Sequence, residues 1–210
     1  MRRLRRAIGA LALICCGACD SSGTPVEKPQ LTTVTLPVGP PAPGLQKTER
    51  LDLSLPIEAY ARFYGMRDAG ARLNELNFVS ANHQGFSRTG NAALDAPASL
   101  SQVVGRFKTA EDARRAIPEL AAAARGVLSA GPAKDITDLP QTALGDSYGW
   151  GWQMTVTSAD GRTVFRAEYT WQRGRNVVTV IALDPERVPE TVGALATELD
   201  RALATPTTTA

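Results

Sequence analysis

Outside its first residues, the chain is poor in the side chains that most often carry catalysis or hold metals. It has one histidine, His83, and three cysteines, all between positions 15 and 19. Zinc sites use mainly histidine and cysteine ligands, so the composition argues against one. The chain contains no Gly-x-Ser-x-Gly or Ser-x-x-Lys motif and no glycine-rich phosphate loop. We therefore expect a non-enzyme without cofactor or metal, and interpret His83 as an ordinary strand residue.

A hydrophobic run long enough to span a membrane is also missing at the N-terminus. The apolar stretch there covers residues 7–18, which is 12 residues, whereas a spanning helix needs about 20. It follows the basic segment Arg2-Arg3-Leu4-Arg5-Arg6 and ends in small residues before Cys19. This order predicts a secretory signal over residues 1–18 that is removed from the mature protein.

The cleavage region Gly17-Ala18-Cys19-Asp20 resembles the lipobox of bacterial lipoproteins, although Cys16 stands where the lipobox usually has leucine. The resemblance implies cleavage before Cys19 and attachment of lipid to its thiol and new amino group. An ordinary cleaved signal is the alternative. We expect an extracytoplasmic protein held on the cell membrane by lipid at Cys19.

The signal also accounts for the positive charge of the chain. The formal net charge is +2, and residues 1–18 contain four arginines and no acidic residue, so the processed protein carries 2 − 4 = −2. This balance does not suggest a nucleic-acid partner.

The next segment lacks the composition of a folded core. Residues 20–49 contain no aromatic side chain and six of the 14 prolines, which predicts a disordered tether. The expected organisation is a signal at 1–18, a tether at 19–50, one domain at 51–204 and a frayed tail at 205–210.

Patterns within the domain predict an α+β fold. Polar and apolar residues alternate over residues 150–156 and 165–171, and residues 176–183 form a nearly continuous apolar run, with glycine turns between them. This indicates a three-stranded antiparallel meander at the C-terminal end of the sheet. We expect further strands at 78–89 and 100–107, one or two helices at 56–77, a capped helix that Pro118 kinks or splits, and a last helix after Pro189. The predicted architecture is an antiparallel β-sheet with helices packed mainly on one face.

Five aromatic residues in the first hairpin of this meander are the feature with most binding potential. They are Tyr148, Trp150, Trp152, Tyr169 and Trp171. One interpretation places them in the core under the C-terminal helix. The other has some of them line a cleft for an apolar, glycan or peptide ligand, with Gly149 and Gly151 leaving room for its approach.

Three segments followed by a final helix resemble a known family. They are Val104-Gly105-Arg106-Phe107-Lys108-Thr109-Ala110-Glu111-Asp112-Ala113, Leu144-Gly145-Asp146-Ser147 and Arg173-Gly174-Arg175-Asn176-Val177-Val178-Thr179-Val180. In this order they are similar to the PknH-like extracellular sensor domains of actinobacterial lipoproteins and of some receptor Ser/Thr kinases. The kinase domain carries disulfides, which the mature chain lacks.

This resemblance implies a curved antiparallel sheet with helices on one side and a cleft that takes a ligand, and it supplies no catalytic residues. It favours a membrane-anchored protein with a non-catalytic domain that binds a ligand or an envelope protein. The alternative function is a structural or accessory envelope protein that acts through protein contacts alone.

Overall fold

The computed structural model describes residues 41, 43–68, 70–90, 96–131, 133–157 and 161–204, except for the side chains of residues 49–52. The predicted signal, Cys19, most of the predicted tether and the predicted tail lie outside these residues. So do parts of the turns expected at 90–97 and 159–161.

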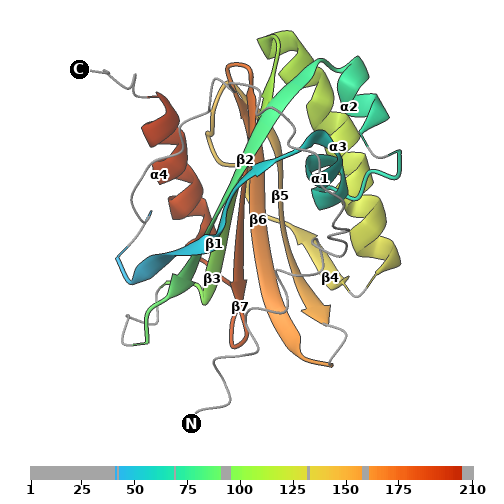
Figure 1. Ribbon diagram of the computed structural model, residues 1–210. Helices are drawn as coiled ribbons and strands as arrows, with labels where there is room; N and C mark the ends of the chain where they lie inside the picture. Colours follow the sequence, from blue (N-terminus) through green and yellow to red (C-terminus); the bar gives the residue numbers. More distant parts are fainter. Residues whose placement is uncertain are drawn as a thin grey trace, which may run out of the picture.

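The described residues build a seven-stranded sheet in the order β1-β2-β3-β7-β6-β5-β4 (Figure 1). Every neighbouring pair is antiparallel. The strands are β1 (Leu45–Leu55), β2 (Phe78–Arg88), β3 (Ser99–Phe107), β4 (Ala133–Asp138), β5 (Ser147–Thr157), β6 (Thr163–Arg173) and β7 (Asn176–Asp184). The predicted α+β class and the β5-β6-β7 meander are confirmed.

The two edge strands were not expected. Strand β1 begins at Leu45, so the sheet extends ahead of the domain boundary predicted at residue 51 and includes the end of the predicted tether. Strand β4 is short and mostly exposed. Strand β4 does not show the alternation that marks a half-buried strand, and β1 shows it only in its second half, where Leu51, Leu53 and Leu55 alternate with polar residues.

The described helices are α1 (Ile57–Phe63), α2 (Ala71–Glu75), α3 (Ala110–Ala130) and α4 (Val192–Ala204). The predicted region at 56–77 is thus two short helices. Helix α3 begins as expected, with Thr109 Oγ1 accepting a hydrogen bond of 3.1 Å from the backbone N–H of Asp112. Pro118 does not split it, because α3 continues as one helix on both sides of the proline. Ile117 and Leu120, on either side of Pro118 in the sequence, are both buried on the side of α3 that packs on the sheet.

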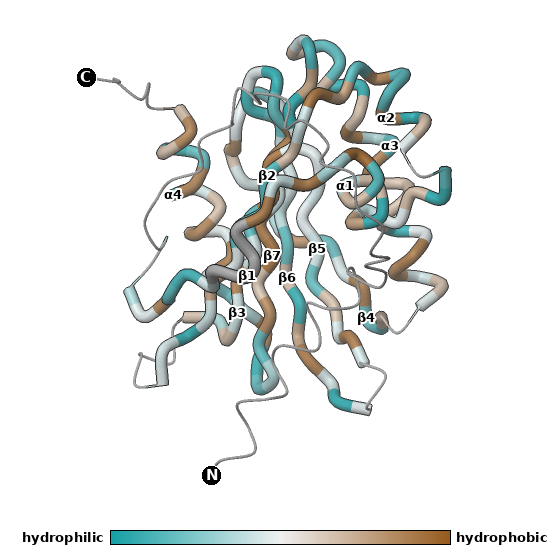
Figure 2. The backbone as a smooth tube through the Cα atoms, viewed as in Figure 1, coloured by the Kyte–Doolittle hydropathy of each residue, from teal (hydrophilic) through white to brown (hydrophobic). Residues whose placement is uncertain are grey.

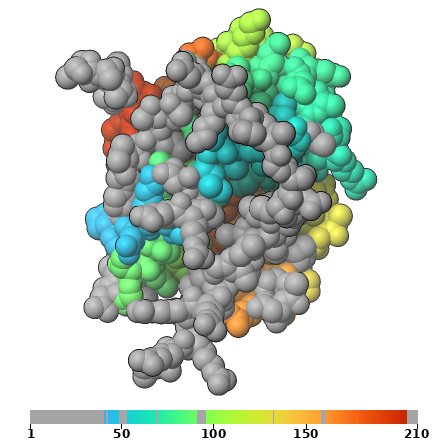
Figure 3. Space-filling model, in the orientation of Figure 1, coloured from blue at the N-terminus to red at the C-terminus, as the bar shows by residue number. Residues whose placement is uncertain are grey.

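The helices lie on both faces of the sheet. Helices α1, α2 and α3 cover one face and α4 covers the other, and the same separation is visible at the molecular surface (Figures 1 and 3). The expected one-sided arrangement therefore holds for α1–α3 only. Each face has its own apolar core, and brown hydrophobic stretches run along the central strands between them (Figure 2). Helix α4 buries Val192, Leu195, Ala196 and Leu199, and each fully buried leucine contributes about 1.5–3 kcal/mol.

Candidate functional site

The five predicted aromatic residues do not form one cluster. In the β5–β6 hairpin, Gly151 lies opposite Tyr169 and Trp152 lies opposite Glu168. Residues opposite each other in an antiparallel pair share a face of the sheet, so the tryptophans of β5 and the aromatic residues of β6 point to opposite faces. A register shift in β5 between Tyr148 and Trp150 puts these two side chains on opposite faces, so Tyr148 packs against the core beneath α4.

Trp150 and Trp152 belong to the core beneath α1–α3 and not to the core beneath α4, where one of the two interpretations of the sequence put them. They are only 5% and 4% exposed. Trp150 Nε1 donates a hydrogen bond of 2.9 Å to Glu168 Oε1, and Arg125 lies over the Trp152 ring at 5.5 Å. Their rings are held inside the protein and are not presented to a ligand.

The space beside Gly149 and Gly151 is filled by the protein itself. A Cβ atom on Gly151 would lie 2.5 Å from Tyr169 Cε1 and 2.8 Å from the Tyr148 hydroxyl. A Cβ on Gly149 would lie 2.7 Å from the carbonyl oxygen of Thr170. The two glycines allow close packing within the hairpin and leave no opening for a ligand.

On the α4 face, by contrast, a pocket of about 220 Å³ opens between the segment before β5, the end of β6 and helix α4. Tyr148 is the one predicted aromatic residue among those that line it. The lining residues are Gln141, Thr142, Ala143, Leu144, Gly145, Asp146, Ser147, Tyr148, Arg173 and Asp200.

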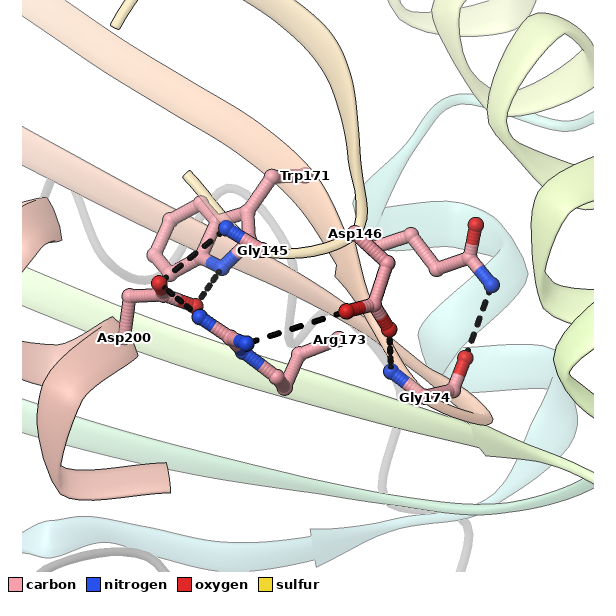
Figure 4. Close-up of polar contacts among 7 residues, drawn as sticks. Gly145, Asp146, Trp171, Arg173, Gly174 and Asp200 are labelled. Atoms are coloured by element: carbon pink, nitrogen blue, oxygen red, sulfur yellow. Dashed lines mark hydrogen bonds and ion pairs between the residues drawn. The ribbon is translucent and has the colours of Figure 1, made fainter. Parts of the chain in front are cut away.

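Asp200 of α4 is the centre of the polar contacts around this pocket (Figure 4). Its Oδ1 accepts hydrogen bonds from Trp171 Nε1 at 2.7 Å and from Arg173 Nε at 2.9 Å. Its Oδ2 accepts from the backbone N–H of Gly145 at 3.0 Å and from Arg173 Nη2. One carboxylate thus joins β6, α4 and the segment before β5.

The surroundings of Asp200 keep it ionised. Burial raises the pKa of this carboxyl, but the hydrogen bonds from Arg173, Gly145 and Trp171 outweigh it, so the pKa lies below its ordinary value. The same contact with Asp200 raises the pKa of Arg173. The pair is therefore charged throughout the neutral range and is neither a proton donor nor a proton acceptor there.

Asp146 stands at the rim of the pocket, with its side chain 53% exposed. Its Oδ2 accepts a hydrogen bond of 2.5 Å from the backbone N–H of Gly174, and its Oδ1 lies 3.7 Å from Arg173 Nη1 (Figure 4). Gly145 beside it has a φ of +57°, and a Cβ there would lie 1.9 Å from the carbonyl oxygen of Gln172. Only glycine lets the chain pass β6 this closely.

Two tyrosines hold the other end of the same segment. The Tyr169 hydroxyl donates a hydrogen bond of 2.9 Å to the carbonyl oxygen of Pro140. The rings of Tyr148 and Tyr169 meet edge to face at 6.4 Å. Burial, Tyr169 and Asp138 raise the pKa of Tyr148 to about 12, so its hydroxyl stays protonated at neutral pH. The segment 140–148 is therefore fixed at both ends.

Sequence reasoning missed Asp146, Arg173 and Asp200 as site residues. Asp146 and Arg173 lie in segments quoted for the family resemblance, and Asp200 lies in the final helix that follows them. A sharper signal was present in α4, because Asp200 follows the buried Ala196 by one helical turn and so falls on the apolar stripe. A buried carboxylate costs free energy unless it is paired with a positive charge or a hydrogen-bond donor, and Arg173 is that partner here.

His83 takes no part in this site. It lies in β2, partly buried beside the Phe63 ring at 6.4 Å, and burial lowers its pKa. In the described part of the chain, no three histidine, cysteine, aspartate or glutamate side chains lie close enough to hold a metal ion. Among the described helices, none is both long and apolar enough to cross a membrane.

Comparison with known proteins finds similarity in structure and none in sequence. No family model matches the chain, and no curated protein matches it. Its structure is similar to the extracellular domain of PknH from Mycobacterium tuberculosis, with a TM-score of 0.43 and 15% identity. The similarity covers 76% of this chain and 81% of that one. At this identity and TM-score, the likeness identifies neither a ligand nor a role for this domain.

Proposed function

We propose that this protein is a lipid-anchored extracytoplasmic lipoprotein whose domain binds a ligand, without catalysis, in the pocket between β6, α4 and the segment 140–148. The observation that carries the binding role is the convergence of separate segments on Asp200. Gly145, Trp171 and Arg173 reach its carboxylate from two elements far apart in the chain. Such convergent polar groups around a concavity are typical of binding sites.

The N-terminal sequence supports the anchoring role. A basic segment, a short apolar run and the residues Gly17-Ala18-Cys19 stand in the order of a lipoprotein signal. Cleavage before Cys19 would leave a polar, proline-rich segment between the lipid and the first strand, β1. Such a segment would hold the domain away from the membrane surface.

The chemistry of the pocket supports a non-catalytic role. Asp200 has both carboxylate oxygens occupied by N–H donors, and its pKa lies below the ordinary value because these donors outweigh the effect of burial. Tyr148, with a pKa of about 12, stays protonated. General acid–base catalysis at neutral pH favours groups whose pKa values lie near the operating pH, and these two groups lie on either side of that range.

Fractionation of cells tests the anchor. The full chain, expressed in a bacterium that processes lipoproteins, should sediment with membranes, and the Cys19→Ala variant should be released in soluble form. Cys16→Ala is the matched control, because Cys16 lies within the predicted signal, and it should stay with the membranes. Equal release of the wild type and Cys19→Ala would overturn the anchoring role.

The indole N–H groups of two tryptophans test the binding role by NMR. Trp171 Nε1 donates to Asp200 beside the pocket, and Trp150 Nε1 donates to Glu168 in the opposite core. The probe is a delipidated hydrolysate of bacterial envelope, which contains sugars and peptides, added to the ¹⁵N-labelled mature chain carrying Cys19→Ala. The Trp171 signal should shift while the Trp150 signal stays. An unchanged Trp171 signal would favour the structural or accessory role.

A further inference from the structure

We infer that the pocket binds a neutral sugar unit of a glycan and discriminates against acidic sugars. This inference rests on the proposed binding function and names the chemical class of the ligand. Three properties of the lining carry it: its polarity, its charge, and the pairing of an acceptor with a donor at the rim.

The lining is too polar for an apolar ligand. Besides Asp146, Arg173 and Asp200, it contains the amide of Gln141 and the hydroxyls of Thr142, Ser147 and Tyr148. An apolar molecule would take water from these groups without offering hydrogen bonds in return, which costs free energy for each group left unpaired. A ligand rich in hydroxyl groups replaces the lost water contacts.

The charge of the lining disfavours an anion. Arg173 is the one cation among the lining residues, and both its Nε and Nη2 are directed at Asp200. Asp146 adds a second carboxylate, so the two acids and one base give a formal charge of −2 + 1 = −1. A ligand carboxylate would meet the exposed Asp146 without an unneutralised guanidinium to receive it. A neutral hydroxyl, in contrast, can donate to Asp146.

The rim presents an acceptor and a donor side by side. Asp146 Oδ2 is held by the backbone N–H of Gly174, and Asp146 Oδ1 lies 3.7 Å from Arg173 Nη1. At that distance the two atoms are too far apart for a good hydrogen bond to each other. Adjacent hydroxyls of a sugar ring can each donate and accept, so one can donate to Asp146 Oδ1 while its neighbour accepts from Arg173 Nη1.

The size of the pocket suits a single sugar unit. The volume of about 220 Å³ lies below the roughly 300–1,000 Å³ of pockets that enclose drug-sized ligands. Tyr148, which is partly buried, is among the residues that line the pocket, and tyrosine combines an apolar ring with a polar tip. One unit of a glycan can occupy the pocket while the rest of the chain extends into solvent.

An NMR titration with matched sugars tests the inference on the mature chain carrying Cys19→Ala. The neutral probes are glucose, galactose, mannose, arabinose and N-acetylglucosamine, and the acidic probes are glucuronic and galacturonic acid. At least one neutral sugar should shift the Trp171 indole N–H signal and leave that of Trp150 unchanged. The corresponding acid should bind about tenfold more weakly, or not at all.

One substitution, with a matched control, tests whether Asp146 is responsible for the discrimination against acidic sugars. Asp146→Asn removes the charge but keeps a polar side chain. It should reduce the difference in affinity between a neutral sugar and the corresponding acid to less than about threefold. Asp135→Asn is the matched control, because Asp135 is exposed on β4 with a φ of +54°, which asparagine tolerates. It should leave this difference unchanged.

The titration distinguishes a wrong ligand class from a pocket that binds no ligand. Tri-alanine and hexanol serve as peptide and apolar probes in the same titration. A Trp171 shift with either of these and with no sugar would overturn the sugar inference and leave the binding function standing. Equal binding of neutral and acidic sugars would also overturn it. If neither these probes nor the envelope hydrolysate shifts Trp171, the binding function itself fails.

Discussion

Trp171 Nε1 lies 2.7 Å from Asp200 Oδ1 and donates a hydrogen bond that joins strand β6 to helix α4. The opposite face of the same strand repeats the arrangement, since Trp150 Nε1 donates to Glu168 at 2.9 Å. In both cases an arginine completes the contact, Arg173 with Asp200 and Arg166 with Glu168. Only the Asp200 arrangement adjoins the pocket.

Replacement of Asp200 by asparagine should weaken the fold clearly. The Asp200→Asn change removes one charge of a largely buried ion pair and leaves Arg173 with only the longer contact to Asp146, at 3.7 Å. We expect a loss of about 2–4 kcal/mol in the free energy of unfolding, measured by urea denaturation. Glu198→Gln, which breaks an exposed ion pair with Arg201 on the same helix, should cost less than about 0.5 kcal/mol. Equal losses for the two variants would contradict the central place of Asp200.

The contribution of Asp200 should disappear in acid. Burial raises its pKa, but hydrogen bonds from Arg173, Gly145 and Trp171 bring it below the ordinary value. The folded protein therefore binds this proton less readily than the unfolded chain. The ionised Asp200 carboxylate stabilises the fold fully at pH values above the pKa of about 3.9 that this group has in the unfolded chain. This stabilisation is lost as the pH falls through the lower pKa of the group in the folded protein. The stability gap between the wild type and Asp200→Asn should stay constant from about pH 7 to 5 and shrink toward pH 3. A gap that is independent of pH would show that the ionised form is not responsible.

Substitutions at Gly145 and Gly174 separate the cost of lost close packing from the cost of backbone strain. Their φ angles are +57° and +55°, but only Gly145 lacks room for a Cβ, which would meet Gln172 O at 1.9 Å. Gly174→Ala should therefore cost about 1–2 kcal/mol from the left-handed conformation alone. Gly145→Ala should cost about 2–5 kcal/mol, because steric displacement of the segment adds to that strain. Both values come from denaturation curves. Similar losses of unfolding free energy for the two variants would mean that the segment containing Gly145 can move away from β6 without cost.

The two sets of aromatic residues should respond differently to truncation. Trp150 is buried and hydrogen-bonded to Glu168, so Trp150→Ala should cost about 3–5 kcal/mol in unfolding free energy. Tyr148 is partly buried at the pocket, so Tyr148→Ala should cost about 1–2 kcal/mol and leave the protein folded. Calorimetry measures both. If Tyr148→Ala costs as much unfolding free energy as Trp150→Ala, Tyr148 is a core residue and not a lining residue of the site.

The sequence predicts the centre of this fold better than its edges. Alternation in β5 and β6 and the stripe of α4 follow from apolar periodicity, which is strong where one face is buried. The edge strands give a weaker signal: β4 carries no such pattern, and β1 carries it only over residues 51–55, after five consecutive polar residues. The predicted domain begins six residues too late, at residue 51 instead of Leu45. The residues before Leu45 have the composition of a tether, and the first half of β1 continues it without an aromatic residue.

The site itself depends on register and tertiary contact. Alternation puts Trp150 and Trp152 on one face of β5, but the pairing of Gly151 with Tyr169 decides that the aromatic residues of β6 face the other way. A one-residue change of register would reverse this result. The bond between Gly145 and Asp200 spans 55 positions of sequence. Spacing along the chain does not predict such a contact, although Asp200 on an apolar stripe was a signal that a partner existed.

The most direct test of the proposed function is the intact mass of the protein recovered from membranes. We expect a chain that begins at Cys19 and carries the added mass of a diacylglyceryl group and an acyl group at that residue, while Cys19→Ala carries neither. A wild-type protein that begins elsewhere, or begins at residue 19 without lipid, would contradict a membrane-anchored domain.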